Sequence, residues 1–119
     1  MTNAQNSKWN LEERTAQFGE SIIKFCKKIP NNSVTSRLIN QLVGAGTSVG
    51  ANYCEADDAE SKADFRHKIG ICKKEAREAK HFVRMVVVAV PEVKNEAGLL
   101  WQEAKELNLI FNTIYKKVS

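Results

Sequence analysis

The chain has 119 residues, of which 43% are hydrophobic and 27% charged, and its formal net charge is +4. This length is sufficient for one domain with its own core, so residues 1–119 are predicted to form a single domain. No apolar run approaches the roughly 20 residues that a membrane-spanning helix needs, and the first ten residues lack the apolar segment of a signal peptide. We therefore expect a cytoplasmic protein with no membrane partner.

The first predicted helix covers residues 11–28, where apolar side chains recur at helical intervals. They are Leu11, Phe18, Ile22, Phe25 and Ile29. Pro30 disfavours helix in the residue before it, and Asn31 and Asn32 favour a turn, so the helix is expected to end there.

The second predicted helix covers residues 34–56, with Ser33 as its N-cap. Its stripe consists of Leu38, Leu42, Ala45, Val49, Asn52 and Ala56. Glycines at 44, 46 and 50 each cost about 1 kcal/mol relative to alanine inside a helix, and close approach of another helix is the simplest feature that would offset this cost. Asn52 is a polar residue on the apolar stripe, where such residues set helix pairing. We interpret it as structural, with ligand contact as the alternative.

The third predicted helix covers residues 61–90, with Ser61 as N-cap and Asp64 three residues later. The acidic residues at 55–60 suit the positive end of this helix, and we prefer this interpretation to metal binding. Its apolar stripe is unbroken: Phe65, Ile69, Cys72, Ala76, Ala79, Val83, Val86 and Val90.

The fourth predicted helix covers residues 92–118 and follows Pro91, which closes the third helix and can open the next. Its stripe is Val93, Ala97, Leu100, Ala104, Leu107, Phe111, Ile114 and Val118. Uninterrupted spacing of three and four residues is typical of bundles, and short connections make neighbouring helices antiparallel. The predicted fold is all-α, an antiparallel up-down-up-down four-helix bundle.

Positive charge is concentrated on the third helix, because residues 61–84 hold eight lysines and arginines against three acids. Six of the basic residues recur at helical intervals and form what we call the basic stripe: Lys62, Arg66, Lys73, Arg77, Lys80 and Arg84. Such a face can neutralise nucleic-acid phosphates without contacting bases. The alternative is a solvated face whose cations pair with acids, as Lys74 could with Glu78. No aromatic residue is interleaved with the stripe, and only Tyr53 and Trp9 remain as candidates for base stacking.

No pattern indicates catalysis. Cys26, Cys54 and Cys72 are odd in number and widely spaced, so we expect buried, reduced thiols and neither disulfides nor a zinc site. His67 and His81 are too far apart to form a metal pair, and the Glu-x-x-His motifs of diiron bundles are missing. We therefore expect a non-enzymatic protein with no cofactor, no metal and no small-molecule substrate.

Three segments carry a resemblance to a known family: Ser48-x-Gly50-Ala51-Asn52-Tyr53-x-Glu55-Ala56, Glu60-Ser61-Lys62-Ala63-Asp64-Phe65 and Lys74-Glu75-Ala76-Arg77-Glu78. They resemble the bacterial four-helix bundle family that includes the proteins encoded in intervening sequences of 23S rRNA genes. The resemblance implies a helical homo-oligomer that forms rings, typically of five subunits. The family also includes accessory proteins of retroelements, which work with a reverse transcriptase and bind nucleic acid through basic surfaces. Five residues match recurring positions of the family and are expected to serve structure or assembly: Asn52, Glu55, Ser61, Phe65 and Glu75.

Two functional hypotheses follow. In the first, the protein presents the basic stripe to RNA or to a ribonucleoprotein such as a reverse-transcriptase complex. In the second, it is a protein-interaction scaffold, and its stripe pairs with an acidic protein or with residues 55–60 of a neighbouring subunit.

Overall fold

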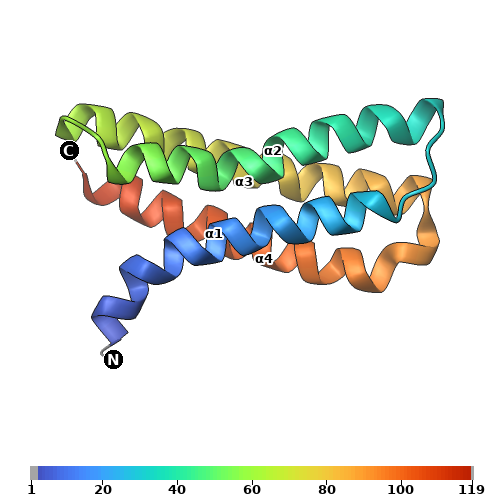
Figure 1. The fold of residues 1–119 in the computed structure, drawn as a ribbon, viewed down its shortest axis with the longest axis horizontal. Coiled ribbons are helices and arrows are strands. Elements are labelled where there is room, and N and C mark those ends of the chain that lie inside the picture. The colour runs from blue at the N-terminus through green and yellow to red at the C-terminus, as the bar shows by residue number, and fades with distance from the viewer. Residues whose placement is uncertain (1–2, 119) are drawn as a thin grey trace.

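A computed structural model describes residues 3–118, with side chains from residue 11 onward. Four helices follow one another along the chain: α1 (Asn3–Lys27), α2 (Ser33–Asp57), α3 (Lys62–Ala89) and α4 (Lys94–Lys117), with a 3-10 turn, η1 (Pro91–Val93), before α4. Consecutive helices run in opposite directions (Figure 1). This arrangement confirms the predicted all-α, up-down-up-down four-helix bundle. None of the described helices is both long and apolar enough to cross a membrane.

Local capping explains where the helices begin, and it corrects one prediction. Asn32, and not Ser33, caps α2, because its side-chain oxygen accepts hydrogen bonds from the N–H groups of Val34 and Thr35. The Thr35 hydroxyl in turn accepts from the Asn32 N–H at 2.9 Å, which completes a capping box. The N-cap therefore lies one residue earlier than predicted. Ser61 caps α3 as predicted, accepting from the Asp64 N–H at 3.0 Å.

Two helix starts differ from the predicted ones by more than one residue, and the remaining boundaries differ by one. The first helix begins at Asn3 instead of residue 11, and Figure 1 shows its first turns diverging from the other helices. The stripe that defined the prediction begins at Leu11, so the pattern gave no signal for the turns before it. The last helix begins at Lys94 instead of residue 92, because Pro91 first opens the 3-10 turn.

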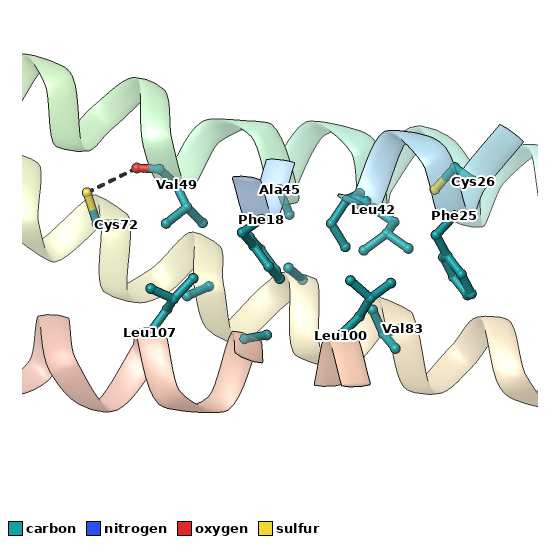
Figure 2. Packing of buried hydrophobic residues seen from close by; sticks show 14 of the residues in the cluster. Phe18, Phe25, Cys26, Leu42, Ala45, Val49, Cys72, Val83, Leu100 and Leu107 are labelled. Carbon is teal, nitrogen blue, oxygen red and sulfur yellow. Dashed lines mark hydrogen bonds between the residues drawn. The ribbon is translucent and has the colours of Figure 1, made fainter. Parts of the chain in front are cut away.

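The apolar stripes of all four helices meet in one core (Figure 2). Its largest fully buried side chains include Phe25, Phe111, Ile22, Leu42, Ile69 and Leu107. On α2 the predicted stripe contained Asn52, but Asn52 is only half-buried. The buried residue is its neighbour Tyr53, which is 6% exposed and whose ring centre lies 5.9 Å from that of Phe111. Adjacent positions on a helix point about 100° apart, and α2 is rotated so that the larger apolar ring is the buried one.

The glycines of α2 mark where α1 approaches closely. A Cβ atom at Gly46 would lie 2.8 Å from Ile22 Cγ1, and one at Gly50 would lie 3.3 Å from Thr15 Oγ1. Close helix approach therefore explains these two glycines, as predicted. It does not explain Gly44, because a Cβ atom there would meet nothing within 4 Å.

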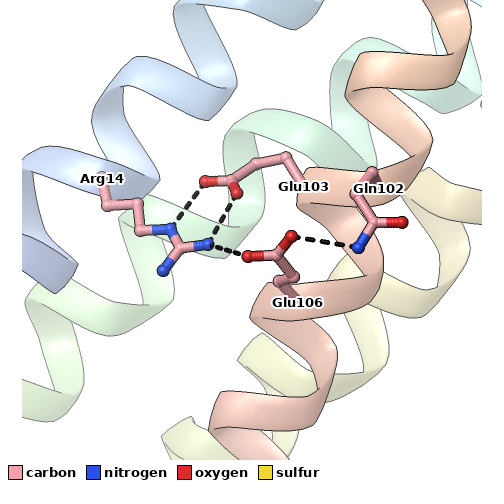
Figure 3. Close-up of polar contacts among 4 residues, drawn as sticks. All are labelled: Arg14, Gln102, Glu103 and Glu106. Atoms are coloured by element: carbon pink, nitrogen blue, oxygen red, sulfur yellow. Dashed lines mark hydrogen bonds and ion pairs between the residues drawn. The ribbon is translucent and has the colours of Figure 1, made fainter.

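The helices are arranged in cyclic order, since α1–α2, α2–α3 and α3–α4 pack extensively. Within the described part of the chain, the diagonal pairs make no close backbone contact. The fourth side, α1–α4, has the sparsest packing and is joined by charged side chains. Arg14 donates two hydrogen bonds to the Glu103 carboxylate, at 2.7 and 2.8 Å, and a third to Glu106 at 2.9 Å (Figure 3). Lys28 pairs with Glu96 at 2.8 Å nearer the other end of α1.

Candidate nucleic-acid interface

The structure places the basic stripe along the side of α3 that faces α4. Its six positions fall within about 60° of rotation at 3.6 residues per turn. The residues divide into two groups by exposure: Arg66, Lys73 and Lys80 are half-buried against α4, whereas Lys62, Arg77 and Arg84 are exposed. The half-buried residues and Arg84 therefore border the groove between α3 and α4, whereas Arg77 lines a hollow on the other side of α3 with Gln41 of α2.

Arg66 is largely occupied by contacts within its own chain. Its Nε donates to the Val118 carbonyl at 2.6 Å, one terminal nitrogen donates to the Tyr115 hydroxyl at 2.9 Å, and the guanidinium carbon lies 3.7 Å from the centre of the Tyr115 ring. A cation at the carbonyl end of a helix is stabilising, because the last carbonyls lack partners within the helix. Arg66 thus secures the end of α4 and has fewer donors left for a partner.

Two lysines of the stripe also contact α4. Lys73 donates to the Asn112 side chain at 3.2 Å, and Asn108 donates to the Lys73 carbonyl at 2.8 Å, which joins the two helices at their middle. Lys80 lies with Nζ 5.4 Å from the centre of the Trp101 ring. These contacts hold the lysine stems without neutralising their charge.

The acidic side chains of α4 that form ion pairs face away from the stripe. The α4 acids Glu96, Glu103 and Glu106 are turned toward α1, where they bind Lys28 and Arg14. Among residues 11–118, no stripe residue forms an ion pair, and the Lys74–Glu78 pair expected under the alternative interpretation is not formed either. The stripe thus keeps its positive charge uncompensated within the described part of the chain.

Four of the five residues matched to the family pattern make contacts within their own chain. Ser61 caps α3 and Phe65 packs against the core. Glu55, in the last turn of α2, pairs with Lys68 of α3 at 2.8 Å, so this acid has a partner in its own chain. Asn52 donates to the Ser48 carbonyl at 2.9 Å, a bond within α2.

The fifth matched residue, Glu75, is half-buried, and burial followed by the charge of Glu78 raises the pKa of its carboxyl group. Because the folded state then favours the protonated form, ionised Glu75 carries a cost to folding at neutral pH.

Two aromatic residues beside the stripe were missed by the sequence reasoning. Trp101 and Tyr115, both on α4, lie against stripe residues of α3, and Lys105 also approaches the Trp101 ring, at 5.5 Å from its centre. The only signal in the sequence was the four-residue spacing of Trp101 and Lys105, which places a cation and an aromatic ring on one face of a helix. Tyr53, which the sequence suggested as a stacking residue, is buried and presents no ring face to a ligand. The side chain of Trp9, the other suggestion, lies outside the described residues.

The cysteines only partly follow prediction. Cys26 and Cys72 are buried, and burial raises their pKa values to about 11 and about 12. The Cys72 thiol donates to the Val49 carbonyl at 3.5 Å (Figure 2). Cys54 is exposed, contrary to prediction, because it follows the buried Tyr53 and points outward. Among the described residues, no three His, Cys, Asp or Glu side chains are grouped so that they could hold a metal ion.

Comparison with known proteins identifies relatives of this arrangement. A family model described as 23S rRNA-intervening sequence protein matches residues 8–89, which is more than half of the chain. The fold is similar to the crystal structure of a protein of unknown function from the S23 ribosomal protein family of Bacteroides thetaiotaomicron. The two chains are 26% identical, the match covers 89% of this chain and 98% of that one, and the TM-score is 0.81. No curated protein matches the sequence.

Proposed function

This chain belongs to the family of 23S rRNA-intervening sequence proteins, and from that premise we propose that it is a non-enzymatic, RNA-binding protein of the cytoplasm. The basic stripe is the proposed contact surface. One observation carries the proposal: six cations lie along one side of α3, and none of them forms an ion pair within the described residues. A row of uncompensated cations attracts a polyanion, because each phosphate neutralised releases counterions into solution.

The proposed partner is a structured RNA or a ribonucleoprotein, including a reverse-transcriptase complex. The exposed residues Lys62, Arg77 and Arg84 are the main phosphate contacts, whereas Arg66 contributes less because α4 occupies its donors. We further propose that the protein is a homo-oligomeric ring of five subunits. The resemblance to the family supports this part of the proposal, and exposed apolar side chains such as Ile23 and Leu99, 42% and 76% exposed, are available for a subunit contact.

A second candidate function is a protein scaffold in which the stripe serves self-assembly. The supporting observation is a groove of about 620 Å³ between α1 and α2, whose lining includes Glu12, Glu13 and Glu20. In the cyclic order of helices, this acidic groove lies on the side of the bundle opposite the α3–α4 groove. The stripe of one copy could therefore meet the acidic groove of the next.

One experiment separates the two functions. Binding of a labelled, structured RNA is titrated across salt concentrations while the oligomeric mass is measured by light scattering. We expect a linear fall of log affinity with log salt for the wild type. The Arg77→Glu/Arg84→Glu variant should lose binding and keep its mass. A charge-matched control, Lys24→Glu/Arg37→Glu, changes two exposed cations away from the stripe and should bind nearly as well as the wild type.

The outcomes are distinct. Loss of the oligomer in the Arg77/Arg84 variant, with RNA binding absent from the wild type even at low salt, would favour the scaffold and overturn RNA binding. Equal weakening by the control variant would show that net charge, and not the stripe, governs affinity.

A further inference from the structure

An apolar groove lies between α3 and α4 at the end of the basic stripe near η1. It has a volume of about 380 Å³ and is open to solvent along one side. Its apolar lining includes Val83, Val87, Val88 and Trp101, and its only charged lining residues are Arg84 and Lys94. Val88 is 76% exposed, so the groove presents apolar surface directly to solvent.

Cations from two helices lie close to the Trp101 ring. Lys80 of α3 and Lys105 of α4 place their Nζ atoms 5.4 and 5.5 Å from its centre. Both distances fall within the roughly 6 Å of cation–π contacts. No acid lines the groove, and the α4 acids Glu96 and Glu103 bind cations of α1. The groove thus combines a half-buried aromatic ring, an apolar floor and four nearby cations.

This combination restricts the chemistry of the occupant. An apolar floor beside an indole favours a flat, weakly polar group, and the surrounding cations favour an anion attached to it. A nucleotide has both features, because its base has an aromatic face and its phosphate is negatively charged. In a duplex the base faces are stacked and unavailable, so only an unpaired nucleotide can place its base against the ring.

We propose that the α3–α4 groove at Trp101 binds an unpaired nucleotide of an RNA strand whose phosphates follow the basic stripe. This inference rests on the proposed RNA-binding function and deepens it. Lys80 and Arg84 belong to both the stripe and the surroundings of the groove, so a strand that follows the stripe reaches the groove without a break. The base lies in the groove beside Trp101, and its phosphates lie near Arg84 and Lys94. The site requires an unpaired nucleotide but tolerates any base, because every base has an aromatic face.

Two variants test the groove in opposite ways. Trp101→Ala removes the half-buried ring, which also packs against the core, so its stability must be checked. Gly98→Leu fills the groove instead, and it should fold because a Cβ atom at Gly98 meets nothing within 4 Å. Leu109→Ala, another exposed apolar position on α4, is the matched control. Each variant is first checked for helicity and thermal unfolding by circular dichroism.

The probes are a 12-nucleotide oligouridine and an RNA duplex of the same length. We expect Trp101→Ala and Gly98→Leu to weaken oligouridine binding by about tenfold or more while duplex affinity changes by less than about twofold. Trp101→Phe should retain much of the affinity, because it keeps an aromatic face. In a Trp9→Phe background Trp101 is the sole tryptophan, and oligouridine should quench its fluorescence whereas the duplex should not.

Failure of this inference is distinguishable from failure of the proposed function. If the wild type binds both probes with steep salt dependence, and the Trp101 and Gly98 variants weaken neither or both equally, the groove inference is overturned and the RNA-binding stripe stands. If the wild type binds neither probe at low salt but polyglutamate quenches Trp101, both are overturned and the groove is assigned to an acidic protein.

Discussion

At the residue scale, burial determines the chemistry of the three thiols. Cys26 and Cys72 lie in the core, where desolvation disfavours the thiolate and raises the pKa to about 11 and about 12. Cys54 lies on the exposed side of α2. Because the thiolate is the nucleophile, only Cys54 combines access with reactivity.

We predict that one thiol per chain reacts rapidly with a colorimetric disulfide reagent at pH 8. The remaining two thiols should react only after denaturation, because they are buried and protonated at that pH. Cys54→Ser should abolish the fast reaction, and Cys26→Ser should leave it unchanged. Rapid reaction of all three thiols in the native protein would contradict the burial of Cys26 and Cys72.

At the element scale, the pairing of α1 with α2 depends on small residues at particular positions. Gly46 lies where Ile22 approaches the α2 backbone, and Gly50 lies where Thr15 does. Gly44 belongs to the same helix but faces open space. The three glycines therefore look alike in sequence and differ in what surrounds them.

We predict opposite effects of alanine at two of these glycines. Gly44→Ala should raise the free energy of unfolding by up to about 1 kcal/mol, because it removes the helix-propensity cost without a clash. Gly46→Ala should lower it by about 1 kcal/mol or more, because the new Cβ would lie 2.8 Å from Ile22 Cγ1 and the overpacking outweighs the gain in propensity. Urea denaturation followed by circular dichroism measures both. A stabilising Gly46→Ala would show that α1 can move away from α2.

At the scale of the whole molecule, α1 is attached less completely than the other helices. It packs on α2, but its other side meets α4 sparsely, through the Arg14 cluster and the Lys28–Glu96 pair. Hydrogen bonds donated by Gln102 and Arg14 lower the pKa of the Glu106 carboxyl. A lowered pKa means that the stabilisation is full above the ordinary value of 4.5 and is lost as the pH falls through the folded value.

We predict that Arg14→Met loosens α1 selectively. Hydrogen exchange measured by mass spectrometry should accelerate in α1 and remain nearly unchanged in α3, with a loss of about 1 kcal/mol in stability at neutral pH. The difference from wild type should shrink as the pH falls below 4.5 and through the lowered pKa of Glu106, because the protonated carboxyl no longer attracts the guanidinium. Lys27→Met, an exposed position on the same helix, is the control. Uniform acceleration across all four helices would show that α1 unfolds only with the whole bundle.

The sequence by itself determined the bundle. The stripes of α3 and α4, from Ile69 to Val86 and from Ala97 to Phe111, are buried as their spacing predicts, because helical periodicity is a local property that burial must respect. Pro30 and Pro91 indicated the connections between helices, and Ser61 indicated the N-cap of α3, for equally local reasons. The basic stripe was also visible in the sequence, since its six residues lie on one helix.

Only the tertiary structure decided what surrounds that stripe. Trp101, Tyr115 and Lys105 are distant in sequence from α3, and their proximity to Lys80 and Arg66 depends on how α4 is rotated against it. The choice of Tyr53 over Asn52 for the core depends in the same way on the Phe111 ring across the bundle. Periodicity indicates which side of a helix is buried. The packing of whole helices determines which residues of another helix lie beside that buried side. For this reason the groove at Trp101 became visible only in the folded chain.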